Sequence, residues 1–526
     1  MRFGQYLKIK PHHPSTRTLL LIAGPLIAFL MIEFLHLDPA NPNVTMMAAV
    51  AVWMALWWMT EVVPLAATAL IPAVMFPFLE IMPENKVAPM YFNSTILLFL
   101  GGMMIALAME RWNLHKRFAL VVIRFVGLSP ARLMLGFVVA TAFLSAWISN
   151  TATAMMMLPI AMAVVKKLEE EGEDSARGLN KFTIGLLLSI AFAASIGGFA
   201  TLVGTPPNLA FAEIFKISFP HAPEISFARW LLFAMPLSLV MLVLAWLFLA
   251  HRYCRHMDSS PTKTGVFMQQ LKELGPMSIQ EKSVMAVFLM TAVLWMTRST
   301  INLGSFTFNG WGSLFQLTDA AGKVTSFVND GTVAITMALL LFVIPTPDKV
   351  NGKRVMLMQA PDLKPLPIGI ILLFGGGFAL AGGFKASGLS AWCGDQLTGL
   401  AGLPPVLLVA AICLVMVAVT NLTSNTATTQ MVLPILVTMG VAVNVNPLLL
   451  MVPATLAASC AFMLPAATPP NAIVFGSERL SVKDMATAGM GLNLIAVVLV
   501  VVAIFTVGNL VLGIDPAVMP EWALKH

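Results

Sequence analysis

A twelve-residue polar motif occurs twice in the chain, as SNTATAMMMLPI at residues 149–160 and SNTATTQMVLPI at residues 424–435. Nine of the twelve positions are identical, and 275 residues separate the two copies. At the same separation, LLFLGG at residues 97–102 precedes the first copy and LLFGGG at residues 372–377 precedes the second. Downstream, VGTPPNLAF at residues 203–211 corresponds to AATPPNAIVF at residues 466–475. Three matches in the same order indicate that the chain contains two related halves.

The composition predicts that both halves lie in a membrane. Of the 526 residues, 58% are hydrophobic and 11% are charged, and the mean hydropathy is +0.86. Soluble domains carry about 25% charged residues, so a soluble enzyme and a disordered scaffold are excluded. The formal net charge of +6 fits the Lys and Arg excess of membrane proteins, and no basic run with interleaved aromatic residues indicates nucleic-acid binding.

Apolar stretches predict an all-α polytopic membrane protein with eleven transmembrane helices. They lie near residues 18–35, 45–59, 62–79, 91–109, 182–214, 230–250, 283–296, 332–344, 366–384, 448–476 and 485–511. Each SNTAT motif interrupts a further apolar stretch, 131–165 or 405–441, which as one helix would be about 52 Å long in a hydrocarbon core of about 30 Å. We therefore predict two re-entrant hairpins with SNTAT at their tips, because non-helical backbone is tolerated at membrane depth where protein or water surrounds it.

The distribution of Lys and Arg predicts the orientation of these crossings. With a cytoplasmic N-terminus, most basic residues, for example Lys116, Arg117, Arg252 and Arg354, fall in cytoplasmic segments. The basic amphipathic segment 111–124 is predicted to lie as a helix on the cytoplasmic surface. The C-terminus is then periplasmic.

Five crossings separate each motif from its copy, so the two halves are predicted to have opposite orientations. The predicted units are an N-terminal extra helix (1–36), a first inverted repeat (45–250), a cytoplasmic linker (251–282), a second inverted repeat (283–512) and an external C-terminal tail (513–526). Each repeat contains one hairpin, 131–165 or 405–441, and one broken helix, 182–214 or 448–476. Inverted repeats with paired discontinuous elements are typical of secondary transporters whose site lies near the membrane midplane.

The two TPPN sequences place proline pairs inside apolar spans, where proline breaks a helix. The break frees the carbonyl groups just before it, at Gly204 and Ala467, and exposes amide groups on the helix that resumes. Carbonyl, hydroxyl and amide oxygens suit a hard cation such as Na⁺, and helix N-termini suit an anion. No Lys, Arg, Asp, Glu or His lies within SNTAT or TPPN, which favours coupling to Na⁺ over coupling to protons. The titratable candidates Glu33, Glu61 and Asp395 are predicted to lie near span ends, and no metalloenzyme or hydrolytic centre is predicted.

With SNTAT twice, each followed by a helix that carries TPPN, the sequence resembles the divalent anion:sodium symporter (DASS) family over essentially its whole length. The resemblance implies a homodimer in which each protomer has a scaffold and a transport domain that moves by an elevator-type displacement. It implies a first Na⁺ site formed by Ser145, Ser149, Asn150 and the carbonyl of Gly204. It implies a second Na⁺ site formed by Thr420, the carbonyl of Thr423, Ser424, Asn425 and the carbonyl of Ala467. The substrate carboxylates would be held by Asn150, Thr151, Asn425 and Thr426, assisted by Thr205 and Thr468.

The predicted function is Na⁺-coupled import of C4-dicarboxylates such as succinate, malate or fumarate across a bacterial inner membrane, with Na⁺ as the co-transported ion and no organic cofactor. Two alternatives belong to the same family: a Na⁺-independent dicarboxylate exchanger, and a Na⁺-coupled citrate or sulfate transporter. An anion channel is a more distant alternative. A membrane-embedded enzyme would need a nucleophile with a base, or paired carboxylates at depth, and the sequence contains neither pattern.

Overall fold

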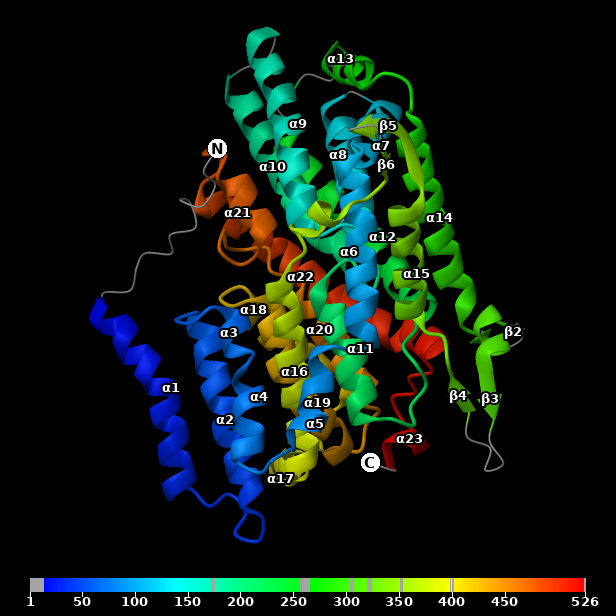
Figure 1. Cartoon of the computed structure of the whole chain (residues 1–526). Coiled ribbons are helices and arrows are strands. Elements are labelled where there is room, and N and C mark those ends of the chain that lie inside the picture. Colours follow the sequence, from blue (N-terminus) through cyan, green and yellow to red (C-terminus); the bar gives the residue numbers. More distant parts are fainter. Residues whose placement is uncertain are drawn as a thin grey trace.

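The computed structural model describes residues 14–127, 129–171, 176–255, 257, 265–302, 307–318, 324–350, 353–397, 399 and 402–524. Within these ranges the chain is a bundle of helices (Figure 1). Three short antiparallel ribbons lie in the connections: β1 (Ile301–Asn302) with β2 (Thr307–Phe308), β3 (Gln316–Thr318) with β4 (Val324–Ser326), and β5 (Pro345–Val350) with β6 (Lys353–Met356). The sequence did not predict these ribbons, because hydropathy identifies apolar segments and the ribbons are short. Residues 1–13 of the predicted N-terminal unit and 258–264 of the predicted linker lie outside the described ranges.

Nine helices in the described ranges are long and apolar enough to cross a membrane. They are α1 (Pro14–Phe34), α2 (Pro42–Thr60), α6 (Ser94–Arg111) with the turns α5 (Glu84–Val87) and η2 (Ala88–Tyr91) before it, α9 (Asn150–Glu171), α10 (Ala176–Gly198), α12 (Phe227–Tyr253), α14 (Ile279–Arg298), α16 (Ile368–Ser387), and α22 (Val482–Val507) with η6 (Gly508–Leu512) after it. Eight of these nine helices lie on predicted crossings, and the ninth, α9, lies in the predicted hairpin 131–165. The other three predicted crossings lie on shorter helices, and one of them, 448–476, is the predicted broken helix. The shorter helices are α3 (Leu65–Thr68) with α4 (Ile71–Phe78), α15 (Asp330–Val343), and α20 (Leu448–Ala458) with α21 (Pro469–Phe475).

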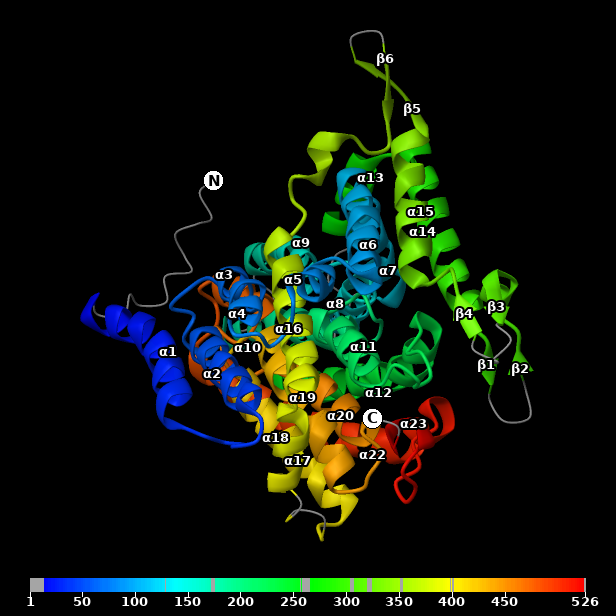
Figure 2. The ribbon, with the colours of Figure 1, turned by 60° about the horizontal axis from the view of Figure 1, so that its bottom comes forward.

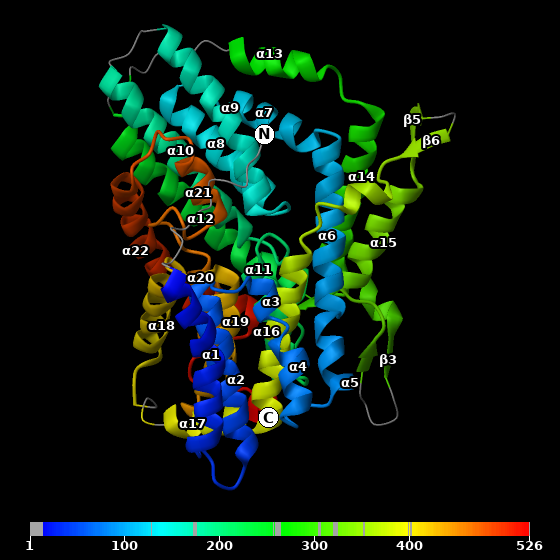
Figure 3. The same ribbon diagram turned by 60° about the vertical axis from the view of Figure 1, so that its left-hand side comes forward.

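Shorter helices complete the bundle and its ends. They are α7 (Leu114–Val126), α8 (Pro130–Ser145), α11 (Pro206–Ser218), α13 (Gly265–Leu274), η3 (Trp311–Phe315), η4 (Ala360–Leu363), α17 (Leu389–Leu397), α18 (Pro405–Thr420), α19 (Asn425–Ala442) and α23 (Glu521–Leu524). The amphipathic helix predicted at 111–124 forms as α7, with Leu120 and Ile123 buried and Val121 exposed. The helix α13 and the β5–β6 ribbon lie at one end of the bundle, and α17 and the β3–β4 ribbon lie at the other (Figures 1 and 3).

The helices form two groups that matter for the site. Helices α8 to α12 and α18 to α22, which we call the site unit, pack on one another: α10 contacts α8 and α12, and α20 contacts α18 and α22. The two halves interlock, because α11 packs against α19 while α9 packs against α21. Helices α6, α14 and α15, which we call the flanking bundle, pack side by side next to this unit (Figures 2 and 3). A separate hydrophobic cluster joins α2 and α4 to α16 and α17, and α1 packs on α2 at the edge of the molecule (Figure 1).

Candidate functional site

Both SNTAT motifs interrupt a helix at equivalent positions. Helix α8 ends at Ser145 and α9 begins at Asn150; helix α18 ends at Thr420 and α19 begins at Asn425. The serine before each resuming helix stands at its N-cap, a position that favours serine. The Ser149 hydroxyl accepts a hydrogen bond from the backbone N–H of Ala152 at 3.2 Å. We call the non-helical residues 146–149 and 421–424 the two tips.

Both TPPN sequences also interrupt a helix. Helix α10 ends at Gly198 and α11 begins at Pro206, and helix α20 ends at Ala458 and α21 begins at Pro469. Proline is tolerated at the first helical position because its missing N–H would have no partner there. Thr205 and Thr468 precede the prolines with extended backbone, and the Thr468 hydroxyl accepts the N–H of Asn471 at 3.4 Å. We call residues 199–205 and 459–468 the two breaks.

The first tip and the first break meet in a cluster of oxygen atoms. The Ser145 hydroxyl, fully buried, lies 2.6 Å from the side-chain oxygen of Asn150 and 2.6 Å from the carbonyl oxygen of Ala194. The same Asn150 atom lies 3.2 Å from the Ala194 carbonyl and 3.3 Å from the Gly204 carbonyl. A hydroxyl has one proton and so satisfies only one of these acceptors. The remaining oxygens require either a rotated Asn150 amide, whose NH₂ would donate to them, or a bound cation.

The second half repeats this geometry. The Thr420 hydroxyl, also fully buried, lies 2.6 Å from the side-chain oxygen of Asn425 and 2.7 Å from the carbonyl oxygen of Ala458. Again one proton faces two acceptors in a buried place. The same arrangement of a hydroxyl, an amide side chain and a backbone carbonyl therefore occurs at two equivalent positions of the fold, as the repeat predicts.

Two glycines allow the first tip and break to approach so closely. A Cβ atom at Gly198 would lie 2.4 Å from the side-chain oxygen of Asn150, and one at Gly204 would lie 2.3 Å from the Gly198 carbonyl and 3.0 Å from the Ala146 carbonyl. These distances leave no room for a side chain. The Thr201 hydroxyl links the same two segments, since it donates to the Ala146 carbonyl at 2.5 Å and accepts the N–H of Gly204 at 3.0 Å.

The predicted residues divide into those that the structure joins and those that it only places nearby. Ser145, Asn150 and Gly204 meet in the first cluster, and Thr420 and Asn425 meet in the second. The remaining predicted residues lie in the tips, in the breaks, or in the first turns of α9 and α19: Ser149, Thr151, Thr205, Thr423, Ser424, Thr426, Ala467 and Thr468. In the second tip, the Thr423 hydroxyl pairs with that of Thr428 at 2.6 Å and donates to the Val419 carbonyl at 2.9 Å.

The similarity of the chain to known proteins identifies its family. Residues 15–514 match the protein family described as "Sodium:sulfate symporter transmembrane region". The chain belongs to the divalent anion:sodium symporter family. Its relatives in this family include the "Sodium-dependent dicarboxylate transporter SdcS" of Staphylococcus aureus strain MRSA252, which is 42% identical over 517 residues, covering 98% of this chain and 95% of the relative. The protein of the same name from strain bovine RF122 / ET3-1 is 43% identical over 498 residues, covering 94% and 92%. Membership of the family makes the chain a multi-pass membrane transporter, and not an enzyme.

Solved structures share the fold at low sequence identity. The YdaH transporter of Alcanivorax borkumensis aligns with a TM-score of 0.54 and 12% identity, covering 88% of this chain and 99% of that one. The Neisseria gonorrhoeae protein MtrF aligns with a TM-score of 0.53 and 12% identity, covering 88% and 94%. At this identity the likeness concerns the fold alone.

Several residues that contact the two clusters or hold the breaks were not predicted from the sequence. The carbonyls of Ala194 and Ala458 contact the hydroxyls of Ser145 and Thr420. Both alanines belong to an Ala-Ala-Ser sequence, at residues 193–195 and 457–459, and this short repeat could have indicated them. The side chains of Asn208 and Asn471, the last residues of the TPPN sequences, hold the breaks. The TPPN repeat itself was the signal for this pair.

The buried carboxylates differ from the titratable candidates taken from the sequence. Glu213, Glu281 and Asp330 are buried. Glu213 accepts a hydrogen bond from the Thr95 hydroxyl, Glu281 pairs with Arg117 at 2.8 Å, and Asp330 pairs with Arg298 at 2.5 Å. Sequence position did not reveal them, because their partners come from distant helices. They lie outside the tips and breaks, and the described residues contain no group of three or more His, Cys, Asp or Glu that could hold a metal ion.

Proposed function

We propose that the protein is a sodium-dependent transporter of C4-dicarboxylates. The observation that carries the proposal is the pair of buried clusters around Ser145 and Thr420, each of which joins a hydroxyl, an amide side chain and a backbone carbonyl. Hydroxyl, amide and carbonyl oxygens are the ligands that a hard cation prefers. Relatives more than 40% identical over nearly the whole chain are named sodium-dependent dicarboxylate transporters, which supports the same cargo here.

We propose that the two Na⁺ ions bind at these clusters. The first Na⁺ would be held by Ser145, Ser149, Asn150 and the carbonyl of Gly204. The second Na⁺ would be held by Thr420, the carbonyl of Thr423, Ser424, Asn425 and the carbonyl of Ala467. With its NH₂ toward them, the Asn150 amide donates to the Ala194 and Gly204 carbonyls; a bound Na⁺ would take the amide oxygen as a ligand instead.

The substrate would bind next to the cations, between the two tips. Asn150, Thr151, Asn425 and Thr426 stand at the first turns of α9 and α19, where unpaired backbone N–H groups attract carboxylates. Thr205 and Thr468 would add hydroxyl donors from the breaks. Because these segments contain no cationic side chain, the anion needs the bound Na⁺ ions for its charge balance, and this requirement couples the two fluxes.

The same proposal extends to topology. The chain would cross the membrane eleven times, with two re-entrant hairpins formed by α8–α9 and α18–α19. The hairpins belong to the inverted repeats 45–250 and 283–512. The reciprocal packing of α11 on α19 and of α9 on α21 supports this topology. A cytoplasmic N-terminus and a periplasmic C-terminus in a bacterial inner membrane place the basic segments 251–282 and 349–364 inside. The test is labelling of intact cells by an impermeant thiol reagent, with the four native cysteines replaced. Ser313→Cys should react, and Glu273→Cys should react only after permeabilisation; the opposite pattern would invert the topology.

We also propose that two copies assemble and that the site unit moves as an elevator against a scaffold that includes the flanking bundle. The site unit contains both oxygen clusters and both breaks, so it would carry the cargo as one piece. Size-exclusion chromatography with light scattering tests the dimer.

The deciding experiment is uptake of radiolabelled succinate into proteoliposomes. Uptake should require an inward Na⁺ gradient, fail when K⁺ replaces Na⁺, and fail in Asn150→Ala and Asn425→Ala. Uptake that is indifferent to Na⁺ and driven by internal dicarboxylate would replace the symporter with an exchanger. Absence of succinate uptake, with citrate or sulfate taken up instead, would change the substrate class.

A further inference from the structure

The last residue of each TPPN sequence braces the break before it. Asn208 and Asn471 have no exposed surface. The side-chain NH₂ of Asn208 donates to the carbonyls of Thr201 at 2.7 Å and Phe199 at 3.3 Å. The side-chain NH₂ of Asn471 donates to the carbonyls of Leu464 and Ala461, both at 2.9 Å. Each amide thus holds two carbonyls that the interrupted helix has left without intrahelical partners.

The brace leads directly to the first oxygen cluster. Asn208 holds the carbonyl of Thr201, and the Thr201 hydroxyl in turn accepts the backbone N–H of Gly204 at 3.0 Å. The Gly204 carbonyl faces the Asn150 amide at 3.3 Å. Two hydrogen bonds thus connect Asn208 through Thr201 to the backbone of Gly204, whose carbonyl faces the first cluster.

Packing alone does not account for these two residues. Among the described residues, the side-chain oxygens of Asn208 and Asn471 are buried without a hydrogen-bond partner, which carries a desolvation cost that an apolar residue would avoid. The arrangement occurs once in each half of the chain, so two independent positions carry the same cost. A primary amide supplies two N–H donors from one atom, which Asp, Ser and Leu cannot do.

We propose that Asn208 and Asn471 are positioning residues for the two cation sites, a role that rests on the proposed sodium-dependent function. Asn208 sets the first site through Gly204, and Asn471 sets the second through the 459–468 break. Neither residue needs to touch the cation.

The test is the Na⁺ dependence of succinate uptake in Asn208→Ala and Asn471→Ala, together with Na⁺-induced thermal stabilisation of the purified proteins. Loss of two hydrogen bonds should raise the Na⁺ concentration for half-maximal uptake about five- to thirty-fold. The succinate KM at saturating Na⁺ should stay near that of the wild type. Asn493→Ala is the matched control, because Asn493 is equally an asparagine of the buried interior, on α22, whose amide atoms have no partner among the described residues.

The outcomes separate the two proposals. Unchanged Na⁺ dependence in both variants, or an equal shift in Asn493→Ala, would overturn the positioning role. If either alanine variant fails to fold, Asn208→Leu and Asn471→Leu, which keep a similar size and lose the donors without adding a charge, provide the same measurement. A wild-type protein without Na⁺-dependent uptake would instead refute the proposed function.

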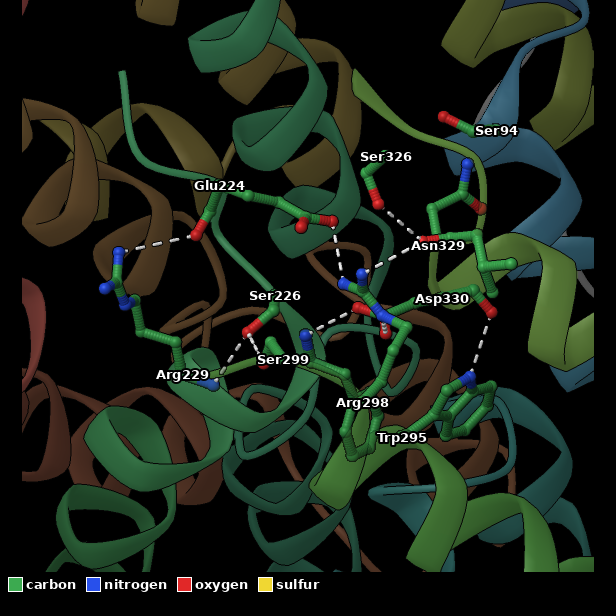
Figure 4. Close-up of polar contacts among 12 residues, drawn as sticks. Ser94, Glu224, Ser226, Arg229, Trp295, Arg298, Ser299, Ser326, Asn329 and Asp330 are labelled. Carbon is green, nitrogen blue, oxygen red and sulfur yellow. Dashed lines mark hydrogen bonds and ion pairs between the residues drawn. The ribbon is translucent and has the colours of Figure 1, made fainter. Parts of the chain in front are cut away.

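A second observation concerns a buried arginine at the boundary between the site unit and the flanking bundle (Figure 4). The side chain of Arg298, at the end of α14, is 4% exposed. Its guanidinium contacts the carboxylates of Asp330 at 2.5 Å and Glu224 at 2.8 Å, and it donates to the Val328 carbonyl at 3.3 Å.

Three contacts of this cluster cross the same boundary. Glu224 belongs to the loop before α12 and binds Arg298 of α14. The second carboxylate oxygen of Asp330, the first residue of α15, accepts the backbone N–H of Phe227 at 2.8 Å. The hydroxyls of Ser226 and Ser299 lie 2.8 Å apart (Figure 4).

Aromatic rings connect the cluster to the first tip. Trp147 in that tip stacks parallel to Trp295 of α14, with ring centroids 6.5 Å apart, and meets the edge of Phe288 at 4.9 Å. The indole N–H of Trp295 donates to the backbone carbonyl of Asp330 at 3.0 Å. The tip that carries the first oxygen cluster is thus packed on the helix that carries the arginine.

We infer that Glu224, Ser226, Phe227, Arg298, Ser299 and Asp330 form a latch that holds the site unit against the flanking bundle and opens during transport. This inference also rests on the proposed function, because a displacement of the site unit along α14 and α15 would have to separate all three contacts. If transport left the site unit fixed against the flanking bundle, the latch would stay closed.

The latch is tested by the double variant Ser226→Cys/Ser299→Cys in proteoliposomes, with the two single variants as controls. Oxidation should cross-link the double variant and abolish its uptake, dithiothreitol should restore the uptake, and the single variants should be unaffected. Wild-type uptake by fully cross-linked protein, as established by mass spectrometry, would overturn the latch. Failure to cross-link would contradict the close approach of the two positions and overturn it as well.

Discussion

Replacing Thr420 by valine removes one hydroxyl from the second oxygen cluster and nearly preserves the side-chain volume. That hydroxyl is fully buried and lies 2.6 Å from the Asn425 side-chain oxygen and 2.7 Å from the Ala458 carbonyl. A hydrogen bond or ligand contact to a charged group contributes about 1.5–3 kcal/mol, and about 1.4 kcal/mol is a factor of ten. We therefore expect the Na⁺ concentration for half-maximal uptake to rise about 10- to 150-fold.

The chain itself provides the matched control for this substitution. Ser145 occupies the equivalent position in the first half and makes the same two contacts, both at 2.6 Å. Thr420→Ser keeps the hydroxyl and should keep a Na⁺ dependence close to that of the wild type. Uptake of labelled succinate is measured over a range of Na⁺ concentrations, with K⁺ holding the ionic strength constant. If Thr420→Val and Thr420→Ser behave alike, the hydroxyl is not a cation ligand and the reasoning fails.

Two further predictions concern a glycine and a histidine. Gly198→Ala would place a methyl group 2.4 Å from the Asn150 side-chain oxygen, so Na⁺-dependent uptake should be lost, whereas Gly369→Ala, whose nearest neighbour would be 3.6 Å away, should transport normally. Equal uptake by the two alanine variants would contradict this account. Burial lowers the pKa of His115, on the amphipathic helix α7, below its ordinary value of about 6.5, so the folded protein favours the neutral ring. As the pH falls below that value, the unfolded chain takes up a proton that the folded chain does not, so the melting temperature should fall. The melting temperature of His115→Gln should fall less over the same pH range. Identical pH profiles of the melting temperature in the wild type and the variant would refute the role of the histidine.

The repeat allowed much of the fold and part of the site to be anticipated. The interruptions at residues 146–149 and 421–424 lie at the SNTAT motifs, and those at 199–205 and 459–468 lie at the TPPN sequences, because proline and N-cap residues act locally. Local chemistry does not determine how long a neighbouring helix is. The predicted hairpin 131–165 contains α9, which extends to Glu171, and polar connections fold into ribbons that hydropathy does not reveal.

The hydrogen-bond and ion-pair partners of buried polar groups could not be predicted from the sequence. Ser145 contacts Ala194 and Thr420 contacts Ala458, 49 and 38 residues further along the chain. The salt bridges of Glu281 with Arg117 and of Arg298 with Asp330 likewise join different helices. A hydrogen bond or ion pair depends on a distance of about 3 Å in space, and sequence spacing does not contain that distance.

The amino-acid sequence by itself determined that the chain is a membrane protein with two related halves, where its helices break, and which residue types stand at the breaks. These properties follow from composition, periodicity and the local behaviour of proline, serine and asparagine. Only the tertiary structure decided which hydroxyl, amide and carbonyl groups meet around Ser145 and Thr420, that Asn208 and Asn471 hold the breaks, and that Arg298 binds two carboxylates from different segments. These contacts arise when segments far apart in the chain pack together, so their energies belong to the folded bundle and to no single helix.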